Sequence, residues 1–132
     1  MNFLTNQLAR YLFFLPFIVL GLIHFLDPKL VLPQIPAIFP YKIIWVYVTG
    51  ALMLGAAIAV LLDRYAKRAL LLLASLMFVF AIVHFYQMVF PQPILNLDGS
   101  ILATKDYVKQ VQIFFFYKQW IIVGACLYMA KK

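Results

Sequence analysis

The side chains in this sequence that could bind a ligand or move a proton are few, and they lie inside long apolar stretches. They are His24, Tyr47, Thr49, His84, Gln87, Lys118 and Gln119. A histidine, a tyrosine and a lysine that converge between apolar walls could hydrogen-bond the carbonyl oxygens of a quinone or the head of a lipid. No catalytic motif is present among them, so we predict no catalytic activity for the chain on its own.

The histidine and cysteine content argues against metal and redox centres. Cys126 is the single cysteine, which excludes an internal disulfide, a CxxC pair and a cysteine-based zinc site. We predict no metal site and expect no cofactor. Two histidines on different helices could ligate a b-type haem, but at 1.5 Å per helical residue the depths of His24 and His84 differ by about 5 Å. Haem is therefore disfavoured, whereas a quinone is compatible with these side chains.

The composition predicts that the solvent of this chain is a lipid bilayer. Of its 132 residues, 67% are apolar and 11% are charged, against about 25% charged residues in an average soluble domain. The net charge is +7. Because the basic residues flank apolar runs, we attribute this charge to anionic headgroups and membrane topology, and we expect no nucleic-acid partner.

Four apolar runs predict an all-α integral membrane four-helix bundle that forms a single domain. Crossing the hydrocarbon core takes about 20 residues. The predicted spans are residues 9–26, 43–62, 69–90 and 111–130, and the outer loops are residues 27–42 and 91–110. The first loop is rich in prolines, so we expect an extended segment. The second is expected to be turn-rich, with a short hairpin around Asp98-Gly99.

The placement of lysine and arginine predicts the orientation of the spans. The side with both termini and the 63–68 turn carries Arg10, Arg64, Lys67, Arg68, Lys131 and Lys132, and the other side carries Lys29, Lys42, Lys105 and Lys109. Short cytoplasmic segments are enriched in these residues. We therefore predict a multi-pass protein of the cell (inner) membrane with both termini in the cytoplasm.

The polar residues inside the spans share one depth. Counted from the outer end of each helix, they fall within about 10 Å of one another in the outer half of the bilayer. This predicts a cavity lined by His24, Tyr47, His84 and Lys118, with Thr49, Gln87 and Gln119 beside them. The alternative stays open for each: a histidine can form an interhelical hydrogen bond, Tyr47 can belong to an aromatic belt, and Lys118 can snorkel to the headgroups.

Small residues and a repeated sequence predict how the helices pack. Ala51, Gly55 and Ala59 recur every four residues, which is a pattern that lets a neighbouring helix approach closely. The sequence Leu-Ile-His-Phe at 22–25 resembles Ile-Val-His-Phe at 82–85. This favours two parallel helical hairpins, which would place His24 and His84 at equivalent points.

Three stretches resemble a known family of membrane proteins. They are Gly-Leu-Ile-His-Phe-Leu-Asp-Pro at 21–28, Ile35-Pro36 followed by Pro40, and Val-Tyr-Val-Thr-Gly-Ala-Leu-Met-Leu-Gly at 46–55. Together they are similar to the DoxX-like family of small four-helix bacterial membrane proteins over residues 17–60. Met53 replaces the glutamate that the family usually carries, and Lys118-Gln119-Trp120 only partly matches its fourth helix. Some relatives are subunits of thiosulfate:quinone oxidoreductases or accompany thiol-redox systems.

Two functions are compatible with these features. The first is an accessory or scaffold subunit of a membrane complex, with a membrane or redox protein as partner, as the resemblance implies. The alternative is a quinone- or lipid-binding protein that uses the polar cavity in the outer half of the bundle. A transporter of this size would need to form a homo-oligomer, and homo-oligomerisation stays open under every hypothesis.

Overall fold

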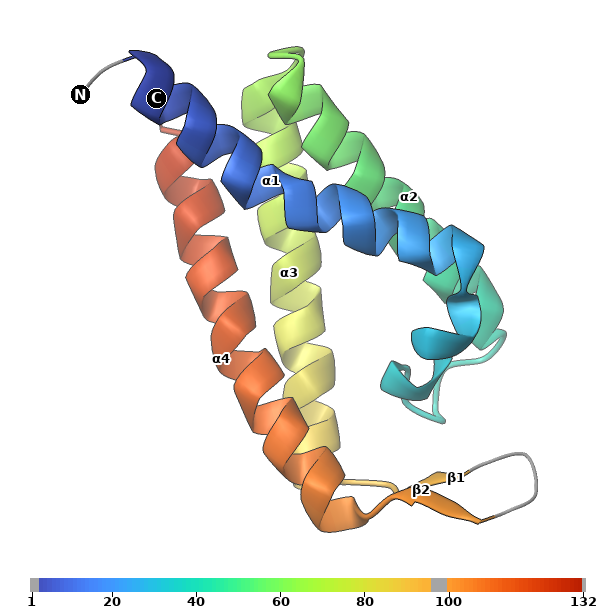
Figure 1. Cartoon of the computed structure of the whole chain (residues 1–132). Helices are drawn as coiled ribbons and strands as arrows, with labels where there is room; N and C mark the ends of the chain where they lie inside the picture. Colours follow the sequence, from blue (N-terminus) through green and yellow to red (C-terminus); the bar gives the residue numbers. More distant parts are fainter. Residues whose placement is uncertain (1–2, 96–99, 132) are drawn as a thin grey trace.

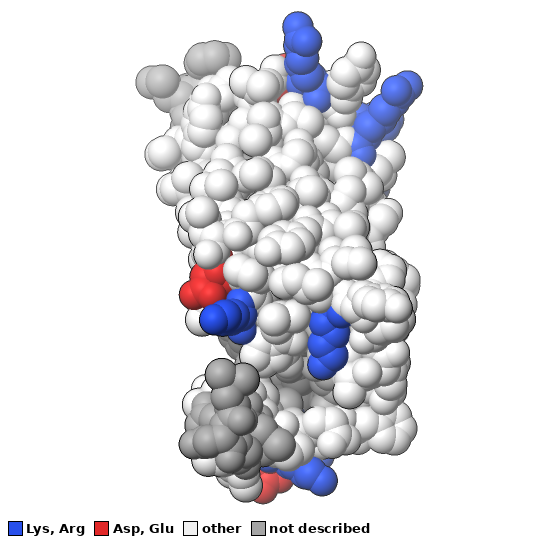
Figure 2. Space-filling model, turned by 90° about the vertical axis from the view of Figure 1, so that its right-hand side faces the viewer, with Lys and Arg blue, Asp and Glu red and all other residues white. Residues whose placement is uncertain are grey.

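The protein is a bundle of long apolar helices. In the computed structural model, which describes residues 3–95 and 100–131, the four helices are α1 (Phe3–Leu26), α2 (Lys42–Leu61), α3 (Ala66–Val89) and α4 (Lys105–Met129) (Figure 1). Each is long and apolar enough to cross a membrane. Figure 2 shows basic side chains at one end of the molecule and again toward the other, with a broad uncharged band between them. The chain is thus an all-α, multi-pass membrane protein, as predicted.

The helices form two antiparallel hairpins that run in the same direction. α1 packs against α2, α3 packs against α4, and α2 joins the two hairpins by packing against α3. Both termini lie at the same end as the α2–α3 turn (Figure 1). Toward the opposite end α1 and α2 slant away from α3 and α4, so the two hairpins diverge.

The apolar core lies in the half of the bundle nearer the termini. Phe14, Leu73 and Cys126 are fully buried there, and Met53 is buried beside them. The guanidinium of Arg10 closes this end, because it donates to the carbonyl of Val60 and to the carboxylate of Asp63, the latter at 2.9 Å. The first hairpin is thereby fastened to the α2–α3 turn at the terminal end.

Two glycines bring α1 and α2 into close contact. A β-carbon added to Gly21 would lie 3.0 Å from the β-carbon of Leu54, and one added to Gly50 would lie 2.5 Å from that of His24. The predicted packing stripe is wrong in part: a β-carbon on Gly55 would meet no atom within 4 Å, and Ala51 is exposed. Only Ala59 packs against the core. A spacing of four residues exceeds one helical turn of about 3.6 residues, so Ala51, Gly55 and Ala59 do not lie on one line along the helix. The face that packs closely against α1 contains Gly50, the residue before Ala51.

The connections differ from the predicted loops. The segment between α1 and α2 contains two 3₁₀ turns, η1 (Pro28–Leu30) and η2 (Leu32–Gln34), rather than an extended strand. Proline occupies the first positions of both turns, where its missing N–H is not needed. The prediction of an extended segment is therefore wrong.

The connection between α3 and α4 is a short hairpin. β1 (Ile94–Leu95) pairs antiparallel with β2 (Ile101–Ala103), and Asp98-Gly99 lies outside the described residues. α4 begins at Lys105, earlier than the predicted 111, because the Thr104 hydroxyl caps it by accepting from the Tyr107 N–H at 3.3 Å. Residues 105–110 are helix and not loop, as a consequence.

Candidate functional site

A cavity of about 840 Å³ lies where the two hairpins diverge. All four helices and the segment between α1 and α2 contribute to its wall. The wall is mostly apolar, with polar groups from His24, Gln34, Thr49, His84, Lys118 and Gln119. Its volume falls in the range of small-molecule sites, which are also apolar clefts with a few placed polar groups. We refer to it as the interhairpin pocket.

His24 presents one ring nitrogen to this pocket. It lies in the last turn of α1, and its Nδ1 is 2.6 Å from the carbonyl oxygen of Leu20. Because a carbonyl oxygen only accepts, Nδ1 carries the proton and donates. The close approach of Gly50 allows the ring to sit between the helices, where it is 7% exposed. Nε2 is therefore the nitrogen that His24 can offer to a ligand.

His84 is the first member of a hydrogen-bonded chain that connects the hairpins. Its Nδ1 donates to Oε1 of Gln112 at 2.6 Å, and Nε2 of Gln112 donates to Oε1 of Gln34 at 3.2 Å. These two hydrogen bonds lead from α3 to α4 and on to η2, the second turn of the α1–α2 segment. The bond to Gln112 places the proton of the His84 ring on Nδ1, as the bond to Leu20 does for His24. Nε2 is therefore the nitrogen of His84 that is available to a ligand.

Gln112 and Gln34 were absent from the candidates drawn from the sequence. Gln112 lies seven residues before Gln119, which is about two helical turns, so the two amides share one face of α4. That spacing is a signal from which Gln112 could have been found. Gln34 lies in an irregular segment without a helical period, and nothing in its surroundings in the sequence indicates that it reaches α4.

Thr49, Lys118 and Gln119 complete the polar lining. The Thr49 hydroxyl donates within its own helix, to the carbonyl oxygens of Trp45 at 2.8 Å and Val46 at 3.0 Å. The Lys118 ammonium lies 4.6 Å from the centre of the Phe115 ring. Oε1 of Gln119 is buried and has no hydrogen-bond partner in the described part of the chain. Lys118 and Gln119 are thus the polar groups of the lining whose interactions are least satisfied by the protein.

Tyr47 and Gln87 do not line the interhairpin pocket, contrary to the prediction. Tyr47 is 40% exposed and stacks on Phe25 with ring centres 5.7 Å apart. It precedes Thr49 by two residues, which is about 200° around a helix, so the two cannot face one cavity. Gln87 is buried one turn beyond His84, and its Oε1 has no hydrogen-bond partner among the residues that the structure describes. Depth did not specify the side of the helix on which Tyr47 lies. Gln87 shares the face of His84 but lies one turn beyond the pocket lining.

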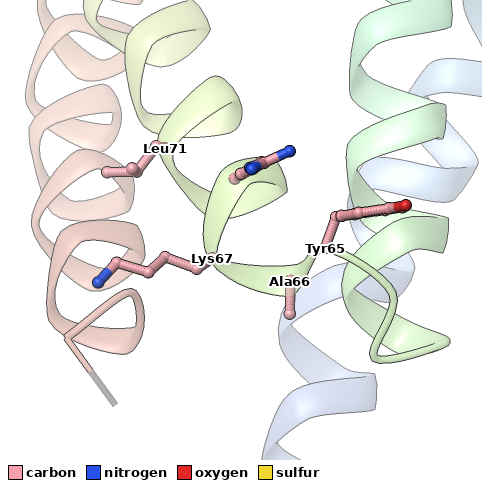
Figure 3. A pocket seen from close by; sticks show the side chains of 5 residues that line it. Tyr65, Ala66, Lys67 and Leu71 are labelled. Carbon is pink, nitrogen blue, oxygen red and sulfur yellow. The ribbon is translucent and has the colours of Figure 1, made fainter.

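A second hollow, of about 470 Å³, lies beside the α2–α3 turn and is a weaker candidate (Figure 3). Lys67 and Tyr65 line it, but their side chains point in opposite directions. The guanidinium of Arg68 lies over the ring of Tyr65, 5.8 Å from its centre. Because its polar groups do not converge on one point, this hollow has less of the character of a binding site than the interhairpin pocket.

Comparison with known proteins assigns a family to the chain but no activity. Neither the curated proteins nor the solved structures contain a match. A family model matches residues 14–97, a stretch that includes His24, Gln34, Thr49 and His84. It ends before α4, so Gln112, Lys118 and Gln119 lie beyond it. Because the matched stretch is more than half of the chain, the protein belongs to the family described as a domain of unknown function, DUF8561.

Proposed function

We propose that the protein binds a quinone or a lipid in the interhairpin pocket. The observation that carries this proposal is the meeting of two histidines, one lysine and one glutamine from three helices on a single apolar cavity. An amphiphile needs both parts of such a site, since its tail is stabilised by the apolar wall and its head by the polar groups.

The exposed edge of the pocket supports entry of a ligand from the bilayer. Leu12, Val48 and Val79 line the pocket and are also exposed, Leu12 to 63%. In a membrane these exposed side chains face lipid. The apolar wall therefore continues onto the lipid-facing surface, and a long hydrocarbon tail can extend through this edge while the head stays inside.

A direct test compares binding of decylubiquinone and of oleate to the purified protein and to His84→Ala. Removing the imidazole takes away the Nε2 group and releases the Gln112 amide, so we expect at least one of the two probes to bind about tenfold more weakly, as for the loss of one hydrogen bond of about 1.4 kcal/mol. Ser75→Ala is the matched control, because Ser75 lies on the same helix outside the pocket lining, and its hydroxyl donates to the carbonyl oxygen of Leu71. Equal affinity of all three proteins for both probes would contradict the proposal.

A second candidate is an accessory subunit of a membrane redox complex. It is supported by the resemblance of residues 17–60 to the DoxX-like family, some members of which are such subunits. The outward-facing Gly55, with open space above it, offers a surface that a partner helix could approach. Purification from native membranes in mild detergent should then recover a stoichiometric partner, and Gly55→Leu should release it. A chain that always migrates alone would exclude this candidate.

A further inference from the structure

The charge of the interhairpin pocket is unbalanced. Lys118 is the one charged side chain among its described lining residues, and none of them is an aspartate or glutamate. Asp63 is engaged by Arg10 at the far end of the bundle. Asp106 lies twelve residues before Lys118 on α4, about 18 Å along the helix axis. Asp27 is exposed and does not line the pocket, and none of the described carboxylates forms an ion pair with Lys118.

The position of Lys118 on α4 makes this imbalance costly. It lies thirteen residues after Lys105 and eleven before Met129, or about 20 Å and about 16 Å from the two ends of the helix. Its side chain is shorter than either distance, so the ammonium group stays beside the middle of the helix, where it is only partly exposed. The ring of Phe115 supplies a cation–π contact, but that contact offsets only part of the cost of a charge among apolar groups.

We propose, building on the proposed binding function, that the ligand of the pocket carries an oxyanion and that Lys118 is its counter-ion. The ligand class is an acyl chain with an anionic head, either the carboxylate of a fatty acid or the phosphate of a phospholipid. The buried amide of Gln119 lies next to Lys118 in sequence and lines the same pocket. Its NH₂ group can donate to the same head, since the two ends of an amide are interchanged by a simple rotation.

Charge distinguishes this ligand from a neutral quinone. Quinone carbonyls accept hydrogen bonds from neutral donors and leave the charge of Lys118 uncompensated. An oxyanion removes that cost and gains charge-assisted hydrogen bonds, which are about twice as strong as neutral ones. Affinity should therefore follow the charge of the head more closely than the shape of the tail.

The experiment uses matched probes on the full chain in detergent micelles, with native mass spectrometry as the readout. Oleate and oleyl alcohol share one chain and differ in the charged head, decylubiquinone is the neutral quinone, and dioleoylphosphatidylglycerol is the phosphate-containing lipid. We expect the wild type to bind oleate or the phospholipid at least tenfold more tightly than oleyl alcohol, and the better of these two identifies the source of the oxyanion.

Variants of α4 assign the effect to Lys118. Lys118→Gln should lose at least tenfold in affinity for the anionic probe and keep its affinity for oleyl alcohol, while Lys118→Arg should retain the preference. Lys109→Gln removes the same charge from an exposed site on the same helix and should leave binding unchanged.

The possible failures are distinguishable. Equal binding of oleate, oleyl alcohol and the phospholipid by the wild type overturns the oxyanion proposal, even if Lys118→Gln does not fold. An anion preference that survives in Lys118→Gln overturns the role of Lys118. Tight binding of decylubiquinone without an anion preference leaves the proposed function standing alone. Failure of every probe to bind overturns both.

Discussion

A β-carbon on Gly50 would stand 2.5 Å from the β-carbon of His24. No pair of real β-carbons approaches so closely, so the absence of a side chain at Gly50 is what admits His24 between α1 and α2. The packing of the first hairpin and the position of one pocket histidine thus depend on the same contact.

Gly50→Ala should therefore push α1 and α2 apart and displace His24. We expect a loss of about 1–3 kcal/mol in the free energy of unfolding, as for other overpacked contacts, together with weaker ligand binding. Gly55→Ala is the matched control on the same helix, because its new methyl group would meet no atom within 4 Å. Thermal unfolding in detergent measures both. If Gly50→Ala proved as stable as Gly55→Ala, the close contact would not exist in the folded protein.

The hydrogen bonds from His84 to Gln112 and from Gln112 to Gln34 predict that replacing the two glutamines destabilises the protein to different extents. Gln112→Leu removes both hydrogen bonds and leaves the buried Nδ1 group of His84 unpaired, whereas Gln34→Leu removes only the outer bond. We expect Gln112→Leu to destabilise the protein more, with a coupling of about 0.5–1.5 kcal/mol between the two positions in a double-mutant cycle. Additive effects within error would show that the two amides do not interact.

The predicted orientation of the protein in the membrane can be tested by labelling variants that carry one introduced cysteine. The native Cys126 is fully buried, so the unmodified protein should resist a membrane-impermeant maleimide and serve as its own control. Arg64 and Lys105 are exposed at opposite ends of the bundle. With the termini in the cytoplasm, Lys105→Cys should react in intact spheroplasts and Arg64→Cys only after permeabilisation. The reverse pattern would place the termini outside.

The sequence was sufficient to predict the four helices and to group several of the polar residues along them. Both follow from counting along the chain, since a span needs about 20 apolar residues and each helical residue adds about 1.5 Å. This count grouped His24, His84 and Lys118, and these three side chains line one pocket. The all-α bundle follows from the same lengths, because a lipid-embedded backbone must satisfy its hydrogen bonds within each helix.

The sequence did not determine which side of each helix faces the pocket. The spans are apolar nearly all round, so no polar stripe sets their rotation. Tyr47 and the pair Ala51 and Gly55 were misplaced for this reason. Gln34 was missed for a different reason. Its contact with Gln112 joins positions that are 78 residues apart, and only the folded path of the α1–α2 segment brings them together.

The polar lining of the pocket stands apart from the apolar core, and this has a consequence for how the protein can change over time. Three members of the buried apolar cluster, Phe17, Met53 and Met77, also line the pocket, whereas the six polar residues of the pocket stand outside that cluster. Substitutions at those six positions therefore remove little of the apolar burial that holds the bundle together. Descendants of this chain are free to change ligand preference at Thr49, Lys118 or Gln119 with little effect on the scaffold, whereas His84 and Gln34 also carry the hydrogen bonds between the hairpins.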